Sequence, residues 1–537
     1  MAYNPRPALA ALAAPVLLGA LAMLACSPVG LPGLIGGATP TVAAAVTGSP
    51  TAPPPAGSPT ASGAGTATPV TAATTATGGA GTPAARATRA AARTAAANPT
   101  GAANSTGAAS STGSAPASGG VNFVLGSTQK VCQLIGETDL QTNKPTTNQS
   151  ETRWGLMGID LGYSFEHDGK LFFTFGDSIP TRTFNGKPNT QGTAPRTADD
   201  DDAIAYTTDT SIGAPGSGVC PRLTFTQYAN GAFKNPVVLG ASGQPAITLR
   251  TNEVPLAGIS DGGHLYVFFA TDNPVDQNGG PSKGNFGSST RSVVGVSDDD
   301  GNTFHYAYDF SQGPGARFVM LAPAAGQDGN LYFWGTQGGD LYRKSPPYLA
   351  RKPVGSLGSA TGLEYWHGLN ADGTPQFMPG EANAAPLFHD TSVDTSGQPQ
   401  TTDCMGEVGV TWNTFLQRWL MLYNCNNPTA TQPRGIYMRT AQQPWGPWSA
   451  PQTIFNPQRD GGYCNFIHRA VTNAQAQCDN LAGPNLLGDY GGDYGPYVLN
   501  RYTTGDTARG TSIIDYTVST WIPYTIVVLQ STLQRAS

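Results

Sequence analysis

From Val121 to its end, the chain is dominated by short apolar runs separated by turns rich in Gly, Pro and Asp. No long segment there has the apolar period of a helix, whereas alternation with a period of two recurs. Five pairs of runs have the length of β-hairpins: Tyr163–Phe175, Gly258–Thr271, Ala322–Thr336, Val408–Tyr423 and Tyr497–Thr520. Hairpins at this spacing are typical of a radial array of small antiparallel sheets. The sequence therefore predicts an all-β fold, a five-bladed β-propeller, over residues 121–537.

One short motif supports this fold class. Residues 297–304 read S-D-D-D-G-N-T-F, which is similar to the Asp-box turn S-x-D-x-G-x-T-F/W of sialidase-type propellers. Asp299 fills its acidic position. Because Asp in turns usually binds backbone N–H groups, we interpret Asp299 as a turn residue and not as a catalytic one.

The N-terminal region has a different character. Residues 1–26 carry one basic side chain, Arg6, followed by an apolar run that ends at Cys26, too short and Ala-rich for a membrane span. The run resembles a bacterial lipoprotein signal peptide, in which Cys26 is lipidated; ordinary secretion is the alternative. Residues 27–120 are almost wholly Ala, Thr, Gly, Ser and Pro, which predicts a disordered tether. We expect an extracellular protein, anchored to the cell surface by a lipid on Cys26.

Cysteine usage agrees with export. Six of the seven cysteines remain after Cys26, and an even number in an exported chain indicates three disulfides. Cys404 and Cys425 flank the fourth hairpin at equal distances from its turn, so we expect them to pair. The other predicted pairs are Cys464 with Cys478 and Cys132 with Cys220. No spacing typical of metal ligands is visible, so the sequence neither assigns nor excludes a metal, and it predicts no cofactor.

The first hairpin carries a carboxylate at each open end. Asp168-Gly169 predicts a two-residue turn, which places Asp160 opposite Asp177. Carboxylates on directly opposed residues repel unless one is protonated or a ligand intervenes. Glycoside hydrolysis uses such a pair, because one acid protonates the leaving oxygen and the other activates water or attacks. The alternative is that each Asp caps a turn or a strand end.

Several stretches carry a resemblance to a known family. They include the opening hairpin, DDAIAYTTDT, MGEVGVTWNTFLQRWLMLYN and RGIYMRTAQQPWGPWSAPQTIF. From Val121 to Ser537 the chain resembles a bacterial domain family long labelled as of unknown function, which includes endo-D-arabinanases and has a five-bladed propeller fold. The resemblance implies that Asp160 and Asp177 are the catalytic pair at the propeller mouth, acting by an inverting route. Direct opposition would instead favour the short carboxyl separation of a retaining enzyme.

Five further residues are candidates for the same site. Glu407 begins the fourth strand pair and could be a third catalytic carboxylate, with a structural salt bridge as the alternative. Asp202 and His468 are weaker candidates for substrate binding, because acidic runs are usually solvated and an isolated His is usually structural. Trp154 and Tyr494 offer flat apolar faces with a polar group, which sugar binding requires.

The charge balance limits the partners. With 29 basic and 35 acidic side chains and no Lys/Arg-rich stripe, a nucleic-acid partner is not expected. The sequence thus predicts a monomeric, secreted or surface-anchored glycoside hydrolase that cleaves internal linkages of an arabinan-type polysaccharide. The alternatives are a carbohydrate-binding propeller without turnover and a protein-binding module, because propellers host many functions.

Overall fold

The computed structural model describes most of the chain beyond the predicted tether. The described residues are 120–180, 201–226, 253–271, 290–389, 399–425, 435–469 and 491–536, with Leu481 and several short strands between these ranges. The predicted signal peptide, Cys26 and the tether up to residue 119 lie outside them. None of the helices in the described ranges has the length and apolarity that a transmembrane span needs.

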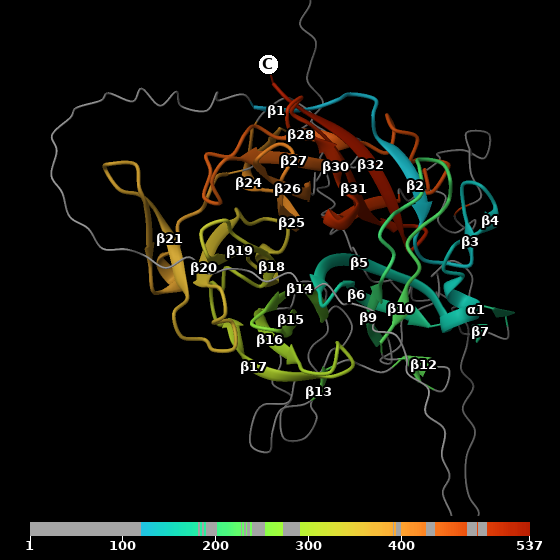
Figure 1. Cartoon of the computed structure of the whole chain (residues 1–537), viewed down its shortest axis with the longest axis horizontal. Coiled ribbons are helices and arrows are strands. Elements are labelled where there is room, and N and C mark those ends of the chain that lie inside the picture. Colours follow the sequence, from blue (N-terminus) through green and yellow to red (C-terminus); the bar gives the residue numbers. More distant parts are fainter. Residues whose placement is uncertain are drawn as a thin grey trace, which may run out of the picture. The chain divides into compact units, whose positions relative to one another are not determined.

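Five sheets, antiparallel except for the parallel edge strand β13, form the blades of a propeller, numbered I to V in chain order (Figure 1). Blade I consists of β5 (Leu156–His167), β6 (Lys170–Pro180), β9 (Asp201–Thr207) and β10 (Thr224–Phe225). Blade II consists of β14 (Val254–Asp261), β15 (His264–Thr271), β16 (Arg291–Ser297) and β17 (Phe304–Ser311), with β13 (Val237–Val238) at its outer edge. Blade III consists of β18 (Met320–Ala325), β19 (Asn330–Thr336), β20 (Tyr348–Pro353), β21 (Glu364–Leu369) and β22 (Pro375–Met378).

Blades IV and V complete the ring. Blade IV consists of β25 (Met405–Asn413), β26 (Arg418–Cys425), β27 (Ile436–Ala441) and β28 (Gln452–Phe455). Blade V consists of β29 (Gly492–Val498), β31 (Thr511–Trp521), β32 (Thr525–Arg535) and β1 (Val121–Phe123), with β2 (Gln129–Gln133) on β32 and β30 (Thr504–Asp506) on β31. The innermost strands contact one another in the order β5, β14, β18, β25, β29 and back to β5. The predicted five-bladed propeller is therefore confirmed.

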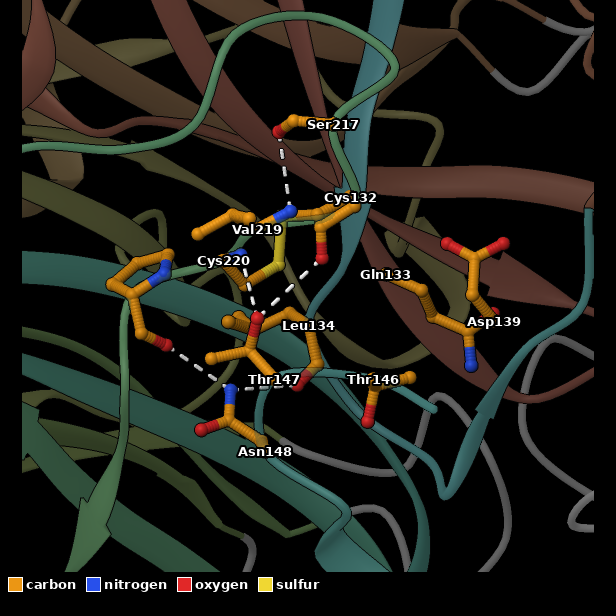
Figure 2. Close-up of a disulfide and its surroundings, with 12 residues drawn as sticks. Cys132, Gln133, Leu134, Asp139, Thr146, Thr147, Asn148, Ser217, Val219 and Cys220 are labelled. Atoms are coloured by element: carbon orange, nitrogen blue, oxygen red, sulfur yellow. Dashed lines mark hydrogen bonds between the residues drawn. A yellow bond between two sulfur atoms is a disulfide. The ribbon is translucent and has the colours of Figure 1, made fainter. Parts of the chain in front are cut away.

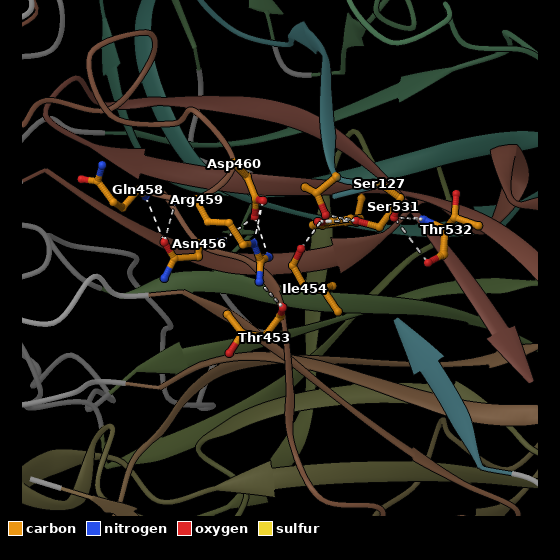
Figure 3. Close-up of polar contacts among 11 residues, drawn as sticks. Ser127, Thr453, Ile454, Asn456, Gln458, Arg459, Asp460, Ser531 and Thr532 are labelled. Atoms are coloured by element: carbon orange, nitrogen blue, oxygen red, sulfur yellow. Dashed lines mark hydrogen bonds and ion pairs between the residues drawn. The ribbon is translucent and has the colours of Figure 1, made fainter. Parts of the chain in front are cut away.

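Both ends of the domain meet in blade V. The N-terminal strands β1 and β2 pair with the C-terminal strand β32, so that the first and last segments close the ring together. Figure 3 shows polar contacts within this closure and in the neighbouring segment of blade IV. The Thr128 hydroxyl donates to the Ile454 carbonyl at 2.5 Å, and the Thr532 N–H donates to the Ser127 hydroxyl at 3.0 Å.

The predicted hairpins are largely confirmed. In the first, His167 pairs with Lys170 across Asp168 (φ 45°) and Gly169 (φ 75°), which is the expected two-residue turn. The fifth pair is antiparallel, as β29 and β31, but η5 (Asn500–Tyr502) and β30 lie between its strands. Asp299 accepts hydrogen bonds from the N–H and hydroxyl of Thr303 at 2.8 and 2.7 Å, as an Asp-box turn residue should.

Two of the three predicted disulfides are confirmed. Cys132 is bonded to Cys220, and Cys404 to Cys425 (Figure 2 shows the first). The second bond joins the open ends of β25 and β26, where Met405 is the Cα partner of Cys425. Cys464 is also disulfide-bonded, and Cys478, its predicted partner, lies outside the described residues.

A buried acid in blade V makes stability depend on pH. Asp515 is 2% exposed, and burial raises its pKa to about 6 although Gln530 donates a hydrogen bond to it. The folded state thus holds this proton more tightly than the unfolded state, where the pKa is about 3.9. The stabilisation by protonated Asp515 is complete below about pH 4 and is lost as the pH rises through about 6.

We therefore expect Asp515→Asn to match the wild type in free energy of unfolding near pH 4. At pH 7.5 it should be more stable by about 2–3 kcal/mol. Urea unfolding from pH 4 to 8 measures this difference. Asp299→Asn is the matched control. Burial of Asp299 is outweighed by hydrogen bonds that lower its pKa, so this substitution should cost stability at neutral pH. A constant difference between Asp515→Asn and the wild type across the range would contradict the prediction.

Candidate active site

The two ends of the central channel differ in chemistry. A cavity of about 410 Å³ lies where the carboxyl-terminal parts of all five innermost strands meet, for example at Phe165, Ser260 and Val410. The amino-terminal parts of the same strands therefore gather at the other end. A buried acid lies in the amino-terminal half of three of them (Asp160, Glu407 and Asp493), and the buried Glu253 lies just before a fourth. We call this end the acidic mouth.

Two tyrosines of the innermost strands, Tyr163 and Tyr497, line the cavity and contact each other. The Tyr163 hydroxyl donates to the Pro323 carbonyl of blade III at 2.6 Å, and its ring meets that of Tyr497 with centroids 5.2 Å apart. Burial raises the pKa of Tyr497 well above its usual value, and the nearby Glu407 and Asp160 carboxylates raise it further. Tyr497 thus lies beside two of the mouth acids.

Asp160 does not face Asp177 directly. Its Cα partner in β6 is Gly176, so the predicted register is wrong at this end of the hairpin. The reason is a β-bulge at Gly162 (φ 88°), which leaves Tyr163 paired with Thr174 but shifts Leu161 to Phe175. The Ser519 and Thr517 hydroxyls of blade V hold this bulge by donating to the Leu161 and Gly162 carbonyls, each at 3.2 Å.

Asp177 lies in a second bulge. Between β6 and β9, Gly176 and Asp177 oppose the single residue Asp202, and Asp177 adopts φ 40°. Its N–H donates to Asp202 Oδ1 at 2.8 Å, and its carbonyl accepts from the Tyr524 hydroxyl at 3.2 Å. Asp202 is 3% exposed, so it is not part of a solvated acidic loop. Instead it fixes the backbone of Asp177 in a conformation that a regular strand would not allow.

Tyr494 joins blade V to the first carboxylate. Its hydroxyl donates to Asp160 Oδ2 at 2.8 Å. Gly495, the next residue, has φ 59° and begins a third bulge, where two residues of β29 oppose Val518 alone. A Cβ on Gly495 would lie 3.6 Å from Leu161 Cα, so the bulges of blades I and V pack together. This packing places the Tyr494 hydroxyl on Asp160.

Glu407 is held from the neighbouring blade. It lies in a fourth bulge, where Gly406 and Glu407 oppose Asn424. Arg343 donates to Glu407 Oε1 at 2.7 Å, and the Tyr342 hydroxyl donates to the same oxygen. Burial opposes the charge of Glu407, but Arg343 and Tyr342 outweigh it and hold its pKa below the usual value. Glu407 Oε2 is buried and has no hydrogen-bond partner among the described residues.

The remaining predicted residues lie in structural surroundings. His468 is fully buried; its N–H donates to the Ile522 carbonyl at 2.8 Å and its carbonyl accepts from Gly491 at 2.9 Å. Trp154 is in helix α1 (Ser150–Trp154), and its ring packs against Phe225 with centroids 5.5 Å apart. For both side chains, substrate binding stays a prediction.

The sequence analysis missed several residues near the mouth. Tyr342 and Arg343 follow the short 3₁₀ helix η1 (Gly339–Leu341) and lie in no recognisable pattern. Glu253 is 2% exposed and precedes Val254, whose side chain would meet a Cβ on Gly176 at 2.7 Å. Its position could have been found, because an acid in the amino-terminal half of an innermost strand, or just before that strand, recurs in four blades.

The family model of the domain of unknown function DUF4185 matches residues 145–530. The chain belongs to the DUF4185 family. The match begins just before β5 and ends within β32, so it spans the acidic mouth of this DUF4185 protein. No curated protein matches the sequence.

Solved structures resemble the DUF4185 chain only distantly. A protein of unknown function from Dyadobacter fermentans is 11% identical (TM-score 0.37; 76% of this chain and 100% of that chain covered). A thermostable family-43 glycoside hydrolase is 11% identical (TM-score 0.36; 71% and 93%). The family-43 glycoside hydrolase YxiA from Bacillus licheniformis is 9% identical (TM-score 0.34; 70% and 72%). Similarity at this level carries no conclusion about the activity of the DUF4185 protein.

Proposed function

We propose that this protein is a glycoside hydrolase that cleaves internal linkages of an arabinan-type polysaccharide. The observation that carries the proposal is a pair of acids on one hairpin, Asp160 (2% exposed) and Asp177 (4% exposed), at the acidic mouth. Both are held by contacts from other strands. Two carboxyl groups so held supply the acid and the base that glycosidic cleavage needs.

The hydrogen bonds suggest which acid has which role. Tyr494 donates to Asp160, and a donor favours the charged form of a carboxylate. Asp160 is then the base: it takes a proton from water, whose oxygen attacks the anomeric carbon. Asp177 is the acid and protonates the leaving glycosidic oxygen. The one-residue offset between Asp160 and Asp177 removes the direct opposition that favoured a retaining route, so we propose inversion.

The charge of the mouth favours a neutral substrate. Asp160, Glu253 and Asp493 are each buried there, and like charges would repel an anionic polymer. D-arabinan, which the family resemblance implies, is neutral. Glu407 Oε2 offers a further acceptor for a sugar hydroxyl.

The proposed location is the cell surface. The disulfides are compatible with an extracellular protein. A lipid on Cys26 would supply the membrane anchor, and the segment from residue 27 to 120 would hold the propeller domain at a distance from that anchor.

A substrate panel tests the proposal. We expect the purified protein to release reducing ends from D-arabinan and to shorten it rapidly, as internal cleavage does. We expect no release from polygalacturonate, an anionic polymer. Reducing-end assays and size-exclusion chromatography measure both effects. Binding of arabinan without any shortening would support a carbohydrate-binding propeller instead, and equal cleavage of both polymers would contradict the charge argument.

A further inference from the structure

A buried ion pair links two blades at the acidic mouth. Arg343 Nη2 of blade III lies 2.7 Å from Glu407 Oε1 of blade IV, and the two side chains are 5% and 3% exposed. Burying two charges costs several kcal/mol per ion. Replacing both members of a buried ion pair by apolar residues of similar volume often leaves a fold at least as stable. Stability alone therefore does not explain this pair.

Arg343 also contacts Tyr494, the residue that donates a hydrogen bond to Asp160. The Arg343 guanidinium lies 5.6 Å from the centroid of the Tyr494 ring and 4.9 Å from that of Tyr342. A nearby positive charge favours the anionic form of a phenol, so it strengthens the phenol as a hydrogen-bond donor. Tyr494 uses this hydroxyl to donate to Asp160 Oδ2 at 2.8 Å. The contacts thus run from Glu407 through Arg343 and Tyr494 to Asp160, across four blades.

We propose that Arg343 is a positioning residue for the reaction proposed above: it fixes Glu407 and, through Tyr494, keeps Asp160 ionised. The inference rests on the proposed function for its catalytic meaning. The predicted effect of Arg343 on the charge state of Asp160 does not depend on the proposed function, because that charge state can be measured without substrate.

The acids around Asp160 explain why a nearby cation is needed to keep it ionised. Acids lie on or beside the strands around the mouth: Asp177 on β6, Asp202 on β9, Glu253 before β14, Glu407 on β25 and Asp493 on β29. Each of these acids that is ionised disfavours ionisation of Asp160, whereas Asp177, the proposed general acid, carries its proton and adds no negative charge. Arg343 and the Tyr494 hydroxyl act in the opposite direction. Removing the cation should therefore raise the pKa of Asp160.

Carbon-13 NMR of the aspartate carboxyls tests this directly. Asp160→Asn assigns the Asp160 signal, and its pKa is then measured in the wild type, Arg343→Met, Arg343→Lys and Tyr494→Phe. We expect Arg343→Met and Tyr494→Phe to raise it by about 1 pH unit, and Arg343→Lys to restore most of the wild-type value. On arabinan, the acidic limb of the kcat/KM profile should move upward by the same amount.

Arg291→Met is the matched control, because the Arg291 side chain is also buried (8% exposed) and forms an ion pair, 2.9 Å from the partly exposed Asp309 in blade II. It should cost stability as Arg343→Met does and leave the Asp160 titration unchanged. An unchanged Asp160 titration in both Arg343→Met and Tyr494→Phe would overturn the inference. If the wild type never shortens arabinan, the proposed function fails, whereas the NMR titration still decides the role of Arg343.

Discussion

Asp160→Asn is expected to fold like the wild type and to lose about 10³-fold or more in kcat on arabinan. An amide has nearly the same shape as the carboxylate and still accepts the hydrogen bond from Tyr494, so the packing of blades I and V persists. It cannot take a proton from water. Asp177→Asn should lose activity to a similar extent, because an amide cannot protonate the leaving oxygen.

The control for these variants is Asp299→Asn. Asp299 belongs to the Asp-box turn of blade II, where it binds Thr303 and Ser297. Its replacement removes charge from a hydrogen-bonded Asp outside the mouth, so it should cost stability and leave kcat within a factor of about two. Reducing-end release measures kcat, and circular dichroism checks the fold. If kcat of Asp160→Asn stayed within tenfold of the wild-type value, Asp160 would not be a catalytic residue.

Cys132→Ser/Cys220→Ser is expected to lose about 4–5 kcal/mol in free energy of unfolding. Cys132 lies on β2, which pairs with β32 of blade V, and Cys220 precedes β10 of blade I. The bond closes a sequence separation of 88 residues and so restricts the unfolded chain strongly. The disulfide also links blade V, which closes the ring, to blade I.

Local hydrogen bonds should keep this region folded in the variant. The Cys220 N–H donates to the Thr147 hydroxyl at 3.0 Å, and Asn148 Nδ2 donates to the Leu134 and Pro221 carbonyls (Figure 2). Cys404→Ser/Cys425→Ser is the comparison. Its separation is 21 residues, so the expected loss is smaller, about 3 kcal/mol. Urea unfolding measures both, and a larger loss for the second pair would contradict the chain-entropy argument.

Much of the fold could be predicted because it follows local rules. Alternating apolar runs specify strands, and Asp168-Gly169 specifies a two-residue turn, so the β5–β6 register is correct next to that turn. The pairing of Cys404 with Cys425 followed from the same geometry. The sequence also made Asp160 and Asp177 site candidates, from their places at the open ends of the first hairpin, and Glu407, from its place at the start of the fourth strand pair; their roles stay predictions.

The site geometry could not be predicted, because it depends on bulges. Asp177 and Glu407 lie in bulges, and Asp160 and Tyr494 lie next to them. A bulge needs no more than one extra residue, and alternation in the sequence does not reveal it. Arg343 was missed for another reason: its partner Glu407 is 64 residues away in another blade, and only the ring closure brings them together.

The most direct measurement follows arabinan chain length and binding in the same samples of wild type and the variant Asp160→Asn/Asp177→Asn. Size-exclusion chromatography gives the length, and calorimetry gives the Kd. We expect the wild type to shorten the polymer, and the variant to bind it with a Kd within a few-fold of the wild type while leaving its length unchanged. Shortening by the double variant at the wild-type rate would contradict catalysis by these two acids.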